Sequence, residues 1–114
     1  MSSRSIRRNE IMLRELSTLL HRHFPGESTL LTLTRVLIDD DLQHGRVFFS
    51  TPDEASRERA EQFLKNRGNR LKYLLAQRVP LRKFPELHFC YDPSLGKELR
   101  IYEILDSLPG NGGK

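Results

Sequence analysis

One helical face runs through a glycine in the middle of the chain, and this feature limits the possible folds more than any other. Apolar residues recur at helical spacing on both sides of Gly68, and their register does not change across it. The face comprises Ala60, Phe63, Leu64, Leu71, Leu74 and Leu75. The pattern predicts two helical halves joined by a kink, not two helices joined by a loop. Before them, Thr51 is the expected cap, with Pro52 at the first helical position and Glu54 completing a capping box.

Three further segments precede this helical stretch. Residues 4–24 carry apolar side chains at helical spacing and stop at Pro25-Gly26. Residues 30–38 are rich in Leu, Thr, Val and Ile, and residues 46–50 follow after a polar turn, so a β-hairpin is expected. The apolar alternation of 30–38 changes parity, which either a bulge near Arg35 or burial of both strand faces would explain.

The C-terminal part adds a third strand over residues 86–91, and Ser94 is positioned to cap a short last helix that reaches about Leu105. With 114 residues, 37% of them apolar, the chain can form one modest core. We expect a single domain over residues 1–108 and a disordered tail over 109–114. A three-stranded sheet with the helices on one face, an α+β fold, is the natural two-layer arrangement for this order of elements.

Composition favours a cytoplasmic protein. The single cysteine, Cys90, excludes an internal disulfide and fits a reducing compartment. No apolar run approaches the roughly 20 residues of a membrane helix, so no membrane contact is expected. The Arg- and Ser-rich start is also compatible with an organelle transit peptide, but it fits the first turns of a folded helix better.

The candidate metal and catalytic clusters all have simpler interpretations. His21 and His23 are two residues apart on a helix and point to different faces. His88 and Cys90 share a strand face, but two ligands do not make a zinc site. Asp39-Asp40-Asp41 lacks the spacing of a calcium loop and fits a turn. No acid, base and nucleophile converge, so we expect no enzymatic activity, cofactor, metal or small-molecule substrate.

The strongest charge feature is a basic run between Gln62 and Pro85 that contains seven lysines or arginines and no acid. These cations are Lys65, Arg67, Arg70, Lys72, Arg78, Arg82 and Lys83. RNA is a dense line of phosphates, and neutralising them releases bound counterions, so a surface of one charge sign gains free energy on binding. An ordinary solvated helix face is the alternative, but the missing acids favour RNA binding.

Neighbouring residues complete the predicted RNA-binding set. Gly68 would let an RNA backbone come close, with helix amides of the second half facing a phosphate. Asn66 and Asn69 would form hydrogen bonds with bases or sugars. Three N-terminal arginines either extend this basic surface or only keep the N-terminus soluble. They are Arg4, Arg7 and Arg8.

The segment LRKFPELHFCYDPSL, residues 81–95, resembles the closing segment of the ribosome-binding factor A family: a basic stretch, Pro-Glu-Leu, an aromatic strand and Tyr-Asp-x-Ser-Leu. The Arg4-x-x-Arg7 start is similar too, and the resemblance covers about residues 4–105. The order of elements is that of type II KH domains. Two features depart from the family: Asn66-Arg67-Gly68 replaces the usual Ala-x-Gly at the kink, and the longer charged C-terminal tail of many members is missing.

The resemblance implies a non-catalytic factor that binds the immature small (30S) ribosomal subunit, contacts its 16S rRNA, assists late maturation and rRNA processing, and matters most in the cold. Such a factor would be a monomer off the ribosome. Because Gly68 is a lone glycine and forms no GxxG loop, base-specific recognition of four nucleotides is not expected. The alternative is a protein-interaction module of KH-like fold that uses a sheet edge or the outer sheet face, with its charge serving only solubility.

Overall fold

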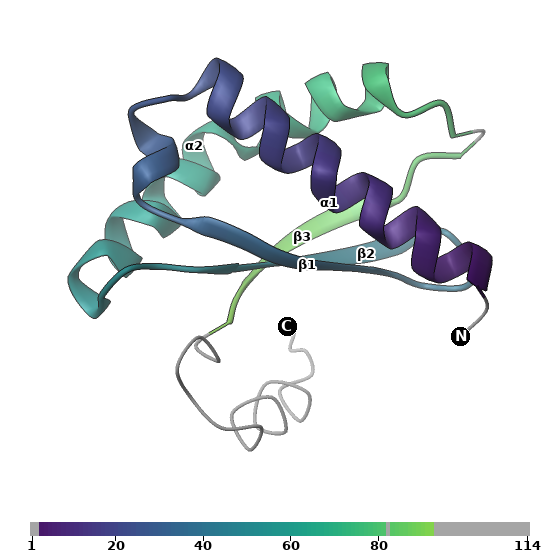
Figure 1. The fold of residues 1–114 in the computed structure, drawn as a ribbon, viewed down its shortest axis with the longest axis horizontal. Helices are drawn as coiled ribbons and strands as arrows, with labels where there is room; N and C mark the ends of the chain where they lie inside the picture. The colour runs from purple at the N-terminus through teal and green to yellow at the C-terminus, as the bar shows by residue number, and fades with distance from the viewer. Residues whose placement is uncertain (1–2, 82, 93–114) are drawn as a thin grey trace.

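The computed structural model describes residues 3–81 and 83–92. In chain order they form six elements, α1 (Ser3–His23), a 3-10 turn η1 (Glu27–Thr29), β1 (Thr32–Ile38), β2 (His44–Ser50), α2 (Glu54–Arg78) and β3 (Glu86–Tyr91). Both helices lie on one face of the sheet (Figure 1). The expected α+β architecture is therefore confirmed, whereas the short helix predicted to reach Leu105 and the tail at 109–114 lie outside the described residues.

The sheet has the strand order β1-β2-β3. β1 and β2 pair antiparallel, as the predicted hairpin requires, and β2 pairs with β3 in parallel. The register of β1 shifts between Leu33 and Arg35, so the bulge explains the change of parity in this strand. Leu33, Val36 and Ile38 are consequently all buried.

The N-terminus of α2 differs from the prediction. The cap is Asp53, whose carboxylate accepts a hydrogen bond from the Ser56 amide at 2.8 Å, and these contacts with Ser56 lower the pKa of Asp53. The Thr51 hydroxyl instead donates to the Asp53 carbonyl at 2.9 Å. The prediction of Thr51 as the cap is wrong, because the helix begins only at Glu54 and Asp53 is the residue within reach of its free amides.

α2 continues through Gly68 as one helix, so the two predicted halves form a single element and no loop separates them. Its buried residues are Ala60, Phe63, Leu64, Gly68, Leu71 and Leu75. Gly68 packs against β3, since a Cβ added to it would lie 3.0 Å from Cε2 of Phe89. The glycine thus allows the middle of α2 to approach the aromatic ring of β3 closely.

α1 fills the rest of this layer. Met12, Leu16 and Leu20 are almost fully buried in the shared core, and Phe24 meets Phe63 of α2 edge to face with ring centres 5.3 Å apart. Among residues 3–81 and 83–92, neither helix is apolar over enough of its length to cross a bilayer.

Candidate nucleic-acid interface

The cations of the basic run in α2 lie on two flanks of its solvent-facing surface. Residues seven apart on a helix lie on the same side, and residues three or four apart are neighbours. Lys65 and Lys72 therefore share one flank, and this flank faces β3, because Lys72 Nζ lies 5.4 Å from the centre of the Phe89 ring. Partial burial lowers the pKa of Lys72, and the Glu86 carboxylate opposes that shift. Lys65 is exposed on the same flank.

The second flank faces α1. Arg67 and Arg70 are exposed and three residues apart. Arg78 lies on the same side by helical spacing, and its Nε donates to Oε1 of Glu15 on α1 at 2.6 Å. Because Glu15 balances its charge, Arg78 is a weaker candidate for binding a phosphate than Arg67 or Arg70.

Between the two flanks runs a row of uncharged side chains, which we call the α2 crest: Gln62, Asn66, Asn69 and Tyr73. All four are exposed, and they follow one another at helical spacing. The Gln62 amide donates to Oδ1 of Asn66 at 3.4 Å, so hydrogen-bonding groups are held at the surface. The crest offers donors and acceptors that bases and sugars can use, with cations on either side for the phosphates.

The crest also contains an aromatic residue that the sequence interpretation missed. The Tyr73 side chain is 55% exposed, and the Arg70 guanidinium carbon lies 5.5 Å from the centre of its ring. An exposed ring beside arginine is a surface on which an unpaired base can stack. The sequence does contain a sign of this position: Tyr73 follows Asn69 by four residues and Asn66 by seven, and this spacing places it on the polar side of the helix.

The N-terminal arginines form a separate patch. Arg4 and Arg7 are exposed and Arg8 is half-buried. In the next turn, Oδ1 of Asn9 accepts a hydrogen bond from the Ile38 amide at 3.2 Å, which fixes this end of α1 over β1. β1 and β3 are opposite edges of the sheet, and Figure 1 shows the purple end of α1 away from the middle of α2. These arginines therefore do not extend the α2 surface.

The last two cations of the basic run lie after α2. Lys83 is exposed in the connection between α2 and β3. Arg82 lies outside the described residues. Of the basic run, α2 thus presents Lys65, Arg67, Arg70 and the paired Arg78 to solvent, and Lys72 in part.

The role predicted for Gly68 is wrong. It is buried against Phe89, so no RNA backbone can approach it from solvent. The amides that follow it are inside a continuous helix and already have carbonyl partners, so they cannot face a phosphate. The glycine allows close approach of the aromatic ring rather than of a ligand.

Comparisons with known proteins agree on one family. The family model described as ribosome-binding factor A matches residues 4–105. A ribosome-binding factor A from Opitutus terrae is 32% identical over 109 residues, which cover 95% of this chain and 89% of that protein. One from Methylobacillus flagellatus is 34% identical over 110 residues, which cover 94% and 86%. The crystal structure of ribosome-binding factor A from Thermus thermophilus matches with a TM-score of 0.67 at 25% identity, over 76% of this chain and 94% of that one.

Proposed function

Because the chain belongs to the ribosome-binding factor A family, we propose that it is a ribosome assembly factor that binds the immature small (30S) subunit and its 16S rRNA through the outer surface of α2. We extend the proposal to assistance in late maturation and rRNA processing, with the strongest need in the cold. The protein acts without catalysis, in the cytoplasm, and is a monomer off the ribosome.

The observation that carries this proposal is the arrangement of charge along α2. A crest of hydrogen-bonding side chains with one exposed aromatic ring runs between Lys65 and Lys72 on one side and Arg67 and Arg70 on the other. Phosphates favour cations, whereas splayed bases favour amides and aromatic rings, so the surface complements irregular RNA better than a uniform duplex. The absence of carboxylates from residues 62 to 85 keeps repulsion of phosphates low.

Sedimentation of a tagged copy through a ribosome gradient tests the proposal. The intact protein should travel with small subunits, and the triple variant R67E/R70E/K72E should stay near the top while keeping its circular dichroism spectrum. A matched control, R14E/R46E, reverses exposed arginines on α1 and on β2 and should still co-sediment. Unchanged co-sedimentation of the triple variant would contradict the proposed surface.

Salt separates this function from a protein-interaction module that uses the outer sheet face. RNA binding should weaken steeply with salt, with a log–log slope of about 0.7 for each contact to a single-strand phosphate. Binding to a mainly apolar protein partner should barely respond. A flat salt dependence, together with loss of binding in R14E/R46E, would favour the alternative.

A further inference from the structure

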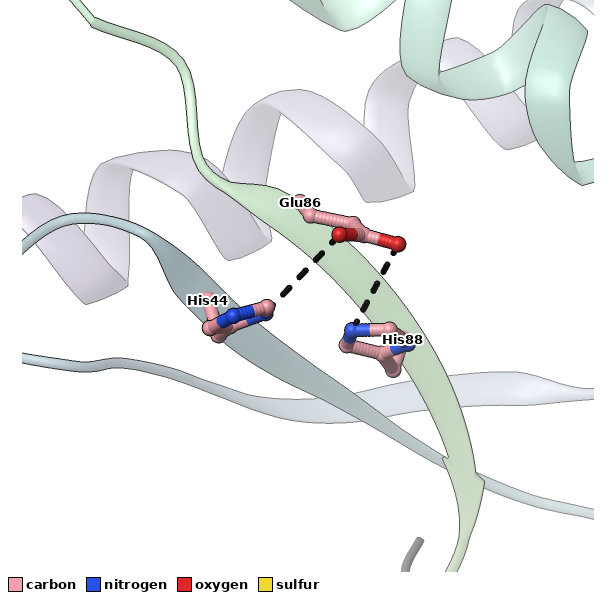
Figure 2. Close-up of side chains that lie close together, drawn as sticks. All are labelled: His44, Glu86 and His88. Atoms are coloured by element: carbon pink, nitrogen blue, oxygen red, sulfur yellow. Dashed lines mark ion pairs between the residues drawn. The ribbon is translucent and has the colours of Figure 1, made fainter. Parts of the chain in front are cut away.

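We propose that His44, Glu86 and His88 form a binding site for a divalent transition-metal ion of the zinc class, on the face of the sheet opposite the helices. The site lies outside the α2 crest, although the Glu86 carboxylate also acts on the charge of Lys72 on the flank beside it. Binding of the ion does not require RNA. Figure 2 shows the three side chains together, with one dashed line from each carboxylate oxygen of Glu86 to one of the two imidazoles.

The strand register brings the three residues together. His44 of β2 is directly opposite Glu86 of β3 in the parallel pair. His88 lies two residues further along β3, so its side chain points to the same face as that of Glu86. The residues between them, Gly45 and Leu87, are buried toward the helices, which leaves the three polar side chains on the opposite face.

The distances suit a shared ion. Nδ1 of His44 lies 3.9 Å from Oε1 of Glu86, and Nε2 of His88 lies 3.9 Å from Oε2. All three ligand atoms are within 4.8 Å of one another. Bonds of about 2.0–2.2 Å in a tetrahedral site would hold them about 3.3 Å apart. The side chains are 55%, 67% and 50% exposed, so rotation about their own bonds can close the remaining gap.

Two imidazoles and one carboxylate are a ligand set that zinc accepts, with the fourth position left to water. Soft or borderline ions that prefer nitrogen, such as zinc, cobalt or nickel, fit this set better than magnesium or calcium, which prefer oxygen. Arg46 is opposite His88 in the register, and its positive charge would repel an ion if it pointed toward the cluster. Its guanidinium carbon instead lies 5.6 Å from the centre of the Phe48 ring, two residues further along β2. The negative charge of Glu86 offsets part of the charge of the ion.

An ion at this position would link β2 to β3, two strands that are separated in the chain by the whole of α2. The three ligands come together only in the folded chain, so the ion binds the folded state and not the unfolded one. The melting temperature should therefore rise as the concentration of the ion exceeds Kd. From the sequence, only Cys90 was expected to share a strand face with His88. In the structure the Cys90 thiol donates to the His88 carbonyl at 3.8 Å, and Cys90 is not one of the three clustered ligands.

Titration of tag-free, chelator-treated protein with zinc chloride in a calorimeter tests the site, and cobalt chloride gives a second readout in the visible absorption of tetrahedral cobalt. A single saturable ion per chain is expected. Loss of a group that only orients a metal ligand weakens binding about 10- to 100-fold, so H44A and H88A should each lose at least that much. E86Q keeps the size of the side chain, removes its charge, and should weaken binding as well.

The variant H21A/H23A is the matched control, because it removes two exposed histidines from α1. It should bind zinc as the intact chain does. Absence of saturable binding to the intact chain would overturn the proposal. Unweakened binding by H44A, H88A and E86Q, with circular dichroism spectra that show all three variants to be folded, would overturn it too. Zinc should raise the melting temperature of the intact chain and of H21A/H23A, but not of H44A.

Discussion

Gly68 of α2 lies against the ring of Phe89 on β3, so closely that an added Cβ would sit 3.0 Å from Cε2 of that ring. The contact joins the middle of the helix to the edge strand of the sheet. It also positions the α2 crest, since the side of the helix opposite Gly68 is the side that faces solvent.

The first prediction concerns this contact. G68V should lower the free energy of unfolding by about 1–3 kcal/mol, because two branches at Cβ must displace a packed ring. N69V places the same β-branched residue at the next, exposed position and should lose only the smaller difference in helix propensity, below about 1 kcal/mol. Urea denaturation of both variants gives the comparison. Equal losses would show that the glycine is not needed for packing.

A second prediction concerns the exposed ring of Tyr73. Stacking of a base on an aromatic side chain contributes about 1–3 kcal/mol, so Y73A should weaken binding of a single-stranded oligoribonucleotide by roughly 5- to 150-fold. Y73F keeps the ring and should bind almost as well as the intact chain. Fluorescence anisotropy measures both. Neither variant should unfold, and undiminished binding by Y73A would remove Tyr73 from the interface.

The third prediction concerns the ion pair of Arg78 with Glu15 and compares its effect on stability with its effect on RNA affinity. Both side chains are partly exposed, and the bond is 2.6 Å long. E15Q and R78Q should each lower the free energy of unfolding by less than about 1 kcal/mol, as for other partly solvated pairs. E15Q should also tighten RNA binding, because it frees the Arg78 charge, whereas R78Q should not. Weaker RNA binding by E15Q would contradict the claim that Glu15 keeps the charge of Arg78 from binding phosphate.

The fourth prediction is a pH dependence at the cap of α2. Hydrogen bonds from Ser56 lower the pKa of Asp53 in the folded chain. A carboxyl whose pKa falls on folding adds stability above its unfolded-state value, and this contribution disappears as the pH drops through the folded-state value. D53N should therefore flatten the loss of stability in acid below about pH 4, and it should lower the melting temperature at neutral pH.

The control for this cap is D40N, which removes an exposed carboxylate from the turn between β1 and β2. Thermal melts of both variants between neutral pH and strong acid measure the difference. If D40N flattened the curve as much as D53N, the cap would not be the cause.

Much of the fold could be predicted because it depends on local patterns. The bulge near Arg35 follows from a change of parity within one strand, and the shared face across Gly68 follows from helical spacing. The function of that glycine could not be predicted in the same way. A glycine within a basic run looks the same whether an RNA phosphate or the ring of Phe89 approaches it, and only the packing of α2 on β3 decides.

The surfaces were harder to predict than the core. The position of His44 opposite Glu86 depends on a parallel register between strands that are separated by a whole helix, and no local pattern encodes it. Likewise, seven cations along one run suggested one surface, but helical geometry divides those of α2 between two flanks. The spacing of Tyr73 from Asn66 and Asn69 places it on the polar side of α2, but spacing alone does not show that its ring is exposed beside Arg70.

Photocrosslinking from the α2 crest tests directly whether this surface contacts rRNA. A photoreactive amino acid in place of Asn66 should crosslink to 16S rRNA in purified small subunits, whereas the same group in place of Arg46, on the opposite side of the sheet, should not. RNA crosslinks are expected from position 66 alone. Crosslinks to RNA from position 46 but not from 66, or crosslinks from 66 only to ribosomal proteins, would show that the α2 crest is not the RNA-binding surface.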